Sequence, residues 1–340
     1  MLTPYTVLDF TDECGEIGPM LLGDMGADVI RVELPGGSRA RYAQPRLKDA
    51  PADLSSLQFL AFNRNKRSIV LDPASTADRE VLTGLIQRAD FVFESAPSRY
   101  LSNYNLDFEQ TRQINPRIVY TRISAFGEGG PYAKLIANDL VIAALGGPVS
   151  LQGVPERAPV RLSVPQVWRH AGAEAAPAAL VAHARMLRCG EAQFVDVSAQ
   201  AAMTWTMLNA MDAYEIQGAD FERGSSGLPG VHIVHKTLDG YIVAPPMSNV
   251  MKACLPWMIE DGIADESLNT IDWDQYDLNA RDPDAKPLSI RQGTDLLTRF
   301  LAKHTKQELF DHGMKNGVTL APVNTLTELL AFDHLEVRGY

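Results

Sequence analysis

The chain has 340 residues, of which 46% are apolar and 21% charged, a composition typical of a globular protein with two domains or one domain carrying an insertion. Its net charge of −11 argues against extensive nucleic-acid binding. The N-terminus carries no basic region followed by a long apolar stretch, so we expect a cytoplasmic protein without a signal peptide or a membrane partner. Three isolated cysteines indicate buried, reduced thiols rather than a disulfide framework or a metal site.

The first third alternates short apolar runs with segments of helical spacing. We predict helices over 19–25 and 76–89, and strands over 6–10, 28–33, 67–72, 91–94 and 117–123. Strands interleaved with helices favour a parallel sheet with both faces covered and right-handed crossovers.

The middle of the chain is predicted to be helical. An Ala-rich helix spans 166–187 and stops at Gly190, and a strand follows over 193–197. Ser198 is expected to cap a second long helix over 198–217. The Gly- and Ser-rich segment 224–230 then resembles a hinge or an active-site loop.

The last third has a different pattern. The runs 231–237 and 241–244 flank Asp239-Gly240, which is typical of a β-hairpin. Helical segments follow near 251–261, 290–303 and 306–316. We therefore predict an α/β protein with a large domain over 1–223, built on a parallel sheet, and a smaller α+β domain over 224–330.

Several short blocks resemble the class III CoA-transferases, the family of formyl-CoA transferase and the CaiB/BaiF proteins. Each block is weak alone, but their order and spacing match across essentially the whole chain. The blocks are 7–10 followed by Gly18-Pro19, 22–33, the Asn-Arg-Asn-Lys-Arg-Ser-Ile run 63–69, 114–117 with 124–132, 138–140, 195–198 and 321–324.

The resemblance implies a Rossmann-like large domain, a small domain, and two protomers interlocked like links of a chain. It implies that the large domain binds coenzyme A or acyl-CoA as a substrate, with a carboxylic acid as the second substrate and no covalently bound cofactor or metal. Residues 331–340 resemble the start of a segment that returns to the large domain in the family, and this return is cut short here.

The resemblance also implies that Trp168 occupies the place of the family's nucleophilic Asp, which attacks the acyl-CoA thioester. An indole offers a hydrogen-bond donor but no nucleophile. Glu174 does not substitute, because six helical residues turn it about 240° away and carry it about 9 Å along the axis. Asp139 aligns with a second acidic position near the nucleophile. It is either a surviving active-site carboxylate or an N-cap for the apolar run 140–145.

Residues that would bind CoA follow from the same blocks and from their chemistry. Guanidinium and ammonium groups on loops suit phosphates, and glycine-containing turns let backbone N–H groups approach them. The alternative for each cation is a solvated surface charge. The predicted set is Gly18, Pro19, Arg39, Arg41, Lys66, Arg67 and Arg99.

Three functions remain open. The chain is a subunit of a heteromeric CoA-transferase whose related partner carries the Asp, an arrangement similar to the benzylsuccinate CoA-transferases. In the second alternative, the chain is an active transferase, for example a homodimer, that uses Asp139 as its catalytic carboxylate. The third alternative is a CoA-binding or scaffolding protein without turnover.

Overall fold

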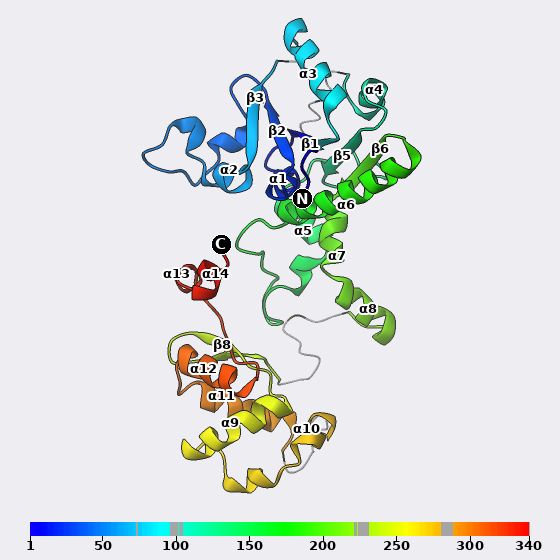
Figure 1. The fold of residues 1–340 in the computed structure, drawn as a ribbon. Helices are drawn as coiled ribbons and strands as arrows, with labels where there is room; N and C mark the ends of the chain where they lie inside the picture. Colours follow the sequence, from blue (N-terminus) through cyan, green and yellow to red (C-terminus); the bar gives the residue numbers. More distant parts are fainter. Residues whose placement is uncertain are drawn as a thin grey trace. The chain divides into compact units, whose positions relative to one another are not determined.

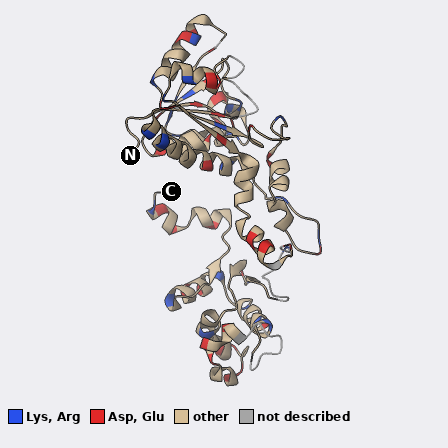
Figure 2. Cartoon of the chain, turned by 90° about the vertical axis from the view of Figure 1, so that its right-hand side faces the viewer, with Lys and Arg blue, Asp and Glu red and all other residues tan. Residues whose placement is uncertain are grey.

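The computed structural model describes residues 1–72, 74–95, 101, 105–220, 223, 231–279 and 288–339. The chain divides into two compact units, Met1–Arg223 and Gly224–Tyr340, each with its own core. The predicted cation Arg99, the segment 224–230 and Tyr340 lie outside the described residues, apart from their assignment to these units. Both signs of charge are distributed over each unit (Figure 2).

The large unit is built on a parallel sheet of six described strands in the order β3-β2-β1-β4-β5-β6. The predicted α/β class is confirmed (Figure 1). The strands are β1 (Thr6–Phe10), β2 (Asp28–Glu33), β3 (Lys66–Val70), β4 (Phe91–Ser95), β5 (Val119–Ser124) and β6 (Gln193–Ser198).

The strand order reverses beside β1. The chain passes from β1 outward to β2 and β3, and then returns to the other side of β1 with β4. In open parallel sheets, ligands bind outside the carboxyl ends of the strands at such a reversal. The reversal beside β1 therefore predicts a ligand site next to the segment that follows Phe10.

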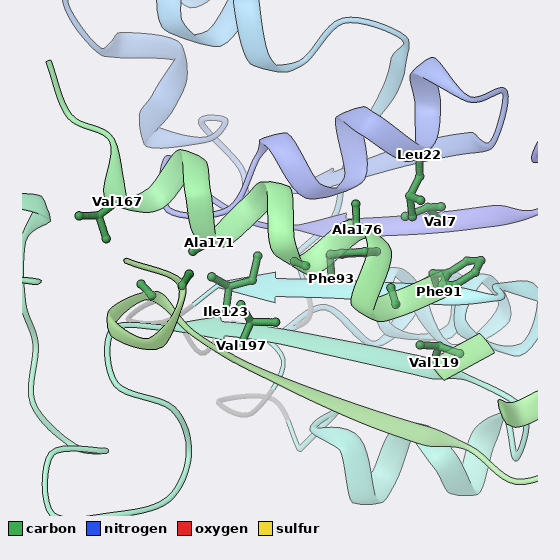
Figure 3. Packing of buried hydrophobic residues seen from close by; sticks show 14 of the residues in the cluster. Val7, Leu22, Phe91, Phe93, Val119, Ile123, Val167, Ala171, Ala176 and Val197 are labelled. Carbon is green, nitrogen blue, oxygen red and sulfur yellow. The ribbon is translucent and has the colours of Figure 1, made fainter. Parts of the chain in front are cut away.

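Two layers of helices cover the sheet, because alternate residues of each strand point to opposite faces. One face carries α1 (Ile17–Asp24) and α6 (Val167–Cys189), whose side chains share a core with Val7 and Phe93. The other face carries α3 (Thr76–Arg88) and α4 (Phe108–Ile114), which pack on alternate positions of the strands. Figure 3 shows α6 lying across the sheet.

Helix α6 is rich in small residues and packs tightly against α1. A Cβ added at Gly172 would lie 3.3 Å from the backbone nitrogen of Gly18 and 3.4 Å from the carbonyl oxygen of Gly15. A side chain at this position would require the neighbouring backbone to give way by a few tenths of an ångström. The helix ends as predicted at Gly190, which adopts a positive φ of 71°.

The second long helix of the prediction, 198–217, is wrong as a single element. Ser198 caps α7 (Ala199–Trp205) as expected, but a second helix, α8 (Leu208–Gln217), begins after a break. At the break, the backbone N–H and the hydroxyl of Thr206 both donate to the carbonyl of Met203. This local bonding competes with the regular helical pattern and ends α7.

The remaining described elements of the large unit are short. They are α2 (Leu57–Phe62), α5 (Asp139–Leu145) and the 3₁₀ turns η1 (Arg39–Tyr42), η2 (Ala52–Leu54) and η4 (Pro148–Leu151). The expectation of buried thiols holds for Cys14 and Cys254 but is wrong for Cys189, which is exposed at the end of α6.

The small unit contains the predicted hairpin. Strands β7 (Val234–Lys236) and β8 (Tyr241–Val243) pair in antiparallel fashion, and β9 (Ala321–Pro322) extends the sheet. The helical elements are α9 (Ser248–Glu260), η5 (Glu266–Thr270), α10 (Trp273–Asn279), α11 (Ile290–Leu301), α12 (Lys306–Asn316), α13 (Leu326–Leu330) and α14 (Asp333–Val337). Among all described helices, none combines the length and apolarity that a membrane crossing requires.

Candidate functional site

A cavity of about 570 Å³ opens in the large unit beside the segment that follows β1. Its wall is formed by this segment, by residues before and within α2, and by the start of α6. The volume lies within the range of small-molecule sites, and the position agrees with the strand reversal at β1. The apolar wall includes Ile17, Leu57, Phe62, Val164, Pro165 and Trp168, and the polar wall includes Glu13, Glu16, Gln44, Gln58, Asp139 and Arg169.

Trp168 and Asp139 come together on this wall. The Oδ2 atom of Asp139 accepts a hydrogen bond of 2.8 Å from the backbone N–H of Val167, in the first turn of α6. The carboxylate thus satisfies one of the amide groups that a helix N-terminus leaves unpaired. Asp139 also lines a second cavity of about 290 Å³, together with Arg161.

Of the two alternatives for Asp139, the one in which it caps its own helix is wrong. The cap of α5 is Asn138, whose Oδ1 atom accepts from the backbone N–H of Val141 at 3.0 Å. Asp139 is the first residue inside α5, and its side chain reaches the next helix along the chain. The carboxylate is therefore held beside Trp168 by a contact that the sequence pattern did not indicate.

A buried charge network lies next to the cavity. Arg31 is 1% exposed and contacts Asp9 Oδ2 and Glu16 Oε1, each at 3.2 Å. The Nζ atom of Lys66 lies 2.8 Å from the same Asp9 oxygen and also donates to Asn63 Oδ1 and the backbone carbonyl of Glu16. Buried ions persist only when they are paired in this way.

The network shifts the acidity of its carboxyl groups in opposite directions. Burial raises the pKa of Glu16. Burial also acts to raise the pKa of Asp9, but the charges of Lys66 and Arg31 outweigh it and hold that pKa below its usual value. Glu16 and Asp9 are therefore near neighbours with unlike environments, a feature that occurs often at functional sites.

The Oε2 atom of Glu16 has no hydrogen-bond partner among the described residues, although it is buried. Its Oε1 atom accepts from Asn63 at 2.9 Å in addition to its contact with Arg31. One oxygen of this carboxyl group is therefore paired and the other is not. Glu16 is also one of the residues that line the cavity.

The predicted CoA-binding cations do not form one cluster. Lys66 is only 2% exposed and belongs to the buried network, so the prediction that its ammonium faces a phosphate does not fit the structure. Arg67 is exposed and pairs with Asp28. Arg41 grips both oxygens of Glu33, at 2.7 Å from Nε and 2.6 Å from Nη2, and Arg39 is exposed in η1.

Gly18 and Pro19 are buried in α1, where Gly18 faces Gly172 and Phe93. Their place indicates a role in packing the two helices that border the cavity. Because both residues are buried, neither offers a side chain that a bound nucleotide could contact.

Asp9, Glu16 and Arg31 were not predicted as site residues from the sequence. A signal was available for two of them, because Asp9 and Arg31 stand at alternate positions from Val7 and Val29 within apolar strands. Charges of opposite sign on the buried face of neighbouring strands indicate an internal ion pair. Glu16 had no such signal, because its burial depends on the packing of α1.

A second buried network lies on the opposite face of the sheet. Glu94 Oε2 accepts from the hydroxyl of Tyr120 at 2.7 Å and from Arg122 Nε at 3.0 Å, and Glu94 Oε1 accepts from the backbone N–H of Leu101 at 2.8 Å. Both oxygens of this carboxyl group are therefore paired, in contrast to those of Glu16.

The chain belongs to CoA-transferase family III, because the model of that family matches residues 2–340. It is 30% identical over 341 residues to the succinyl-CoA:(R)-benzylsuccinate CoA-transferase subunit BbsE of Thauera aromatica, covering 99% of this chain and 82% of the relative. It is 29% identical over 325 residues to the succinate–glutarate CoA-transferase of Agrobacterium fabrum, covering 94% of this chain and 78% of the relative.

Solved structures agree with this assignment. A CAIB/BAIF family protein from Brucella suis matches with a TM-score of 0.81 and 27% identity, covering 99% of this chain and 87% of that protein. Rv3272 from M. tuberculosis matches with a TM-score of 0.76 and 25% identity, again over 99% and 87% of the two chains. The predicted family is therefore confirmed.

Proposed function

We propose that this chain is a subunit of a CoA-transferase that moves CoA between an acyl-CoA thioester and a carboxylic acid, and that a related partner chain supplies the nucleophilic Asp. The observation that carries the proposal is the indole of Trp168 on the wall of the cavity, beside a carboxylate already bonded to Val167. The resemblance assigns the nucleophile to the position of Trp168, and an indole cannot form the acyl-enzyme anhydride.

One of the two relatives supports the proposal that this chain is a subunit of a larger transferase. The T. aromatica relative is described as a subunit of its transferase, and it matches nearly the whole of this chain. In such an assembly the cavity of this chain holds or shapes a substrate while the partner performs the covalent step. Exposed cations such as Arg39 are available for phosphate contacts of CoA.

Co-purification with an Asp-bearing homologue from the same cells tests the proposal. We expect the complex to transfer CoA from a labelled acyl-CoA to a free acid, and the isolated chain to show no transfer above background. Full activity of the isolated chain would contradict the proposal. It would favour the alternative in which Asp139 is the nucleophile, and Asp139→Asn would then abolish the activity.

The substitution Trp168→Asp tests the same assignment within this chain. If the remaining site is competent, the variant should gain CoA-exchange activity and form a hydroxylamine-sensitive acyl adduct. Trp168→Asn is the matched control, because it opens the same space without adding a nucleophile. Equal behaviour of the two variants would count against an intact transferase site and would favour a scaffolding role.

A further inference from the structure

Arg169 is an unpaired cation on the wall of the cavity. Among the described residues that line this cavity, it is the one Lys or Arg side chain, and it is partly exposed. Its guanidinium lies over the ring of Phe62 at 5.2 Å and has no hydrogen-bond or ion-pair partner in the described part of the chain. Because Phe62 offers no oxygen or nitrogen, the N–H donors of this guanidinium are available to a ligand.

Other arginines of the large unit that are withdrawn from solvent are already paired. Arg31, Arg41 and Arg122 each contact a carboxylate oxygen, at 3.2, 2.6 and 3.0 Å respectively. Charges withdrawn from water are normally paired in this way. A guanidinium without a partner beside a cavity therefore indicates a place for an anionic group of a ligand.

The carboxyl groups on the same wall do not neutralise Arg169. Asp139 is bonded to the start of α6, Glu16 belongs to the buried network, and Glu13 is exposed. None of the three forms an ion pair with Arg169 in the described part of the chain. Arg169 also stands in the first turn of α6, where the helix dipole opposes a cation and favours an anion. An anionic group bound at Arg169 would relieve this unfavourable position.

The surroundings of Arg169 favour a carboxylate over a phosphate. A planar carboxylate matches two parallel N–H donors of a guanidinium. It brings one negative charge to a wall that already carries Glu13 and Asp139, whereas a phosphate monoester brings up to two. The rest of the wall is largely apolar and includes Phe62 and Trp168, which suit the hydrocarbon body of an organic acid.

We propose that Arg169 binds a carboxylate of the substrate in this cavity, with the apolar body of the acid against Phe62 and Trp168. The carboxylate is that of the free acid or that at the far end of a dicarboxylic acyl group, and both present the same chemistry to Arg169. This assignment rests on the proposed function, because it names a binding residue of the same cavity. Arg169 binds the substrate and takes no part in the covalent step.

Calorimetric titration of the full chain tests the assignment with two pairs of probes. The members of each pair have similar shape and differ by one negative charge: 4-methylpentanoate and 4-methylpentanamide, and succinyl-CoA and 4-methylpentanoyl-CoA. We expect the charged member of at least one pair to bind about tenfold more tightly, the effect of a charge-assisted hydrogen bond. A gain in the first pair identifies the free acid as the source of the carboxylate, and a gain in the second identifies the acyl group. Equal binding within both pairs would overturn the assignment.

Variants of Arg169 locate the gain. Arg169→Gln should abolish it, and Arg169→Lys, which keeps the charge but loses the planar pair of donors, should reduce it about threefold. Arg185→Gln removes an exposed cation from a later turn of α6 and should leave the gain unchanged. An undiminished gain in Arg169→Gln, or an equal loss in Arg185→Gln, would overturn the role of Arg169. If Arg169→Gln does not fold, an undiminished gain in Arg169→Lys would do so.

Titration with CoA separates this assignment from the proposed function. Absence of binding by CoA and by both thioesters would contradict the proposed function, and the pair of the free acid and its amide would still test Arg169. Binding of CoA and of both thioesters without a preference for either charged probe would contradict only the assignment of Arg169.

Discussion

The two faces of the central sheet carry buried charges in different states. On the α3 and α4 face, Glu94 has both oxygens paired with groups of its own unit, including Tyr120 and Arg122. On the α1 and α6 face, Glu16 has one oxygen paired and one without a partner among the described residues, and it borders a cavity. A complete network stabilises a fold and offers nothing to a ligand. An incomplete network costs free energy of folding, and this one lies beside a cavity. We therefore expect the functional site on the α1 and α6 face of the sheet.

The largest expected effect comes from breaking the complete network. Glu94→Ala would remove the acceptor of the Tyr120 hydroxyl and one of the two carboxylates that pair with the buried Arg122 guanidinium, the other being Glu128, and should lower the free energy of unfolding by about 3 kcal/mol. Urea unfolding followed by circular dichroism measures this change. The control Glu109→Ala removes an exposed carboxylate paired with Arg112 in α4 and should change stability little. Similar losses in the two variants would show that the network on this face is not a major source of stability.

The second-largest expected effect on stability comes from the packing of helices, which is tight on one face of the sheet and loose on the other. Gly172→Ala would force a methyl group to 3.3 Å from the backbone of Gly18 in α1, and should lower the free energy of unfolding by about 1–3 kcal/mol. Gly84→Ala in α3 is the matched control on the opposite face, because a methyl group there meets nothing within 4 Å. It should be neutral or stabilise by up to about 1 kcal/mol. A neutral Gly172→Ala in thermal unfolding would show that α1 and α6 shift enough to admit a methyl group at no net cost.

The smallest effect is a difference in pH dependence between Glu16 and Glu33. Burial acts to raise the pKa of Glu33, but hydrogen bonds from Arg41, Ser68 and the backbone of Ser38 lower it to about 2. Its stabilising contribution is complete above the unfolded value of 4.5 and is lost as pH falls toward 2. Glu16 has a raised pKa, so its burial favours folding at low pH and opposes it as pH rises through the folded pKa.

Glu16→Gln should therefore gain stability relative to the unmodified protein as pH rises above 4.5, while both proteins lose stability at lower pH through Glu33. Thermal unfolding measured from pH 3 to pH 8 provides the comparison. A constant difference between the two proteins over that range would contradict the raised pKa of Glu16.

Much of the architecture could be predicted because it is encoded locally. The apolar strand runs, the stop at Gly190, the cap at Ser198 and the hairpin around Asp239-Gly240 all depend on residues close in sequence. The prediction failed where a side chain had a competing local bond, as at Thr206, which divides the expected helix into α7 and α8. Family membership followed from the order of short blocks along the chain, which a single sequence also contains.

The site was predicted less completely, because burial and partners depend on segments far apart in the sequence. Lys66 matches a loop cation by its neighbours, yet β3 carries it into the sheet, where it meets Asp9. Asp139 matches a helix cap by position, yet Asn138 takes that role and Asp139 bonds to Val167. By itself, the sequence determined the strand and helix pattern, the α/β class and the family, because periodicity and turn residues act over a few positions. Only the tertiary structure decided which charges are buried together and which oxygen of Glu16 remains unpaired, because those states are set by contacts between β1, β2, α1 and the residues before β3.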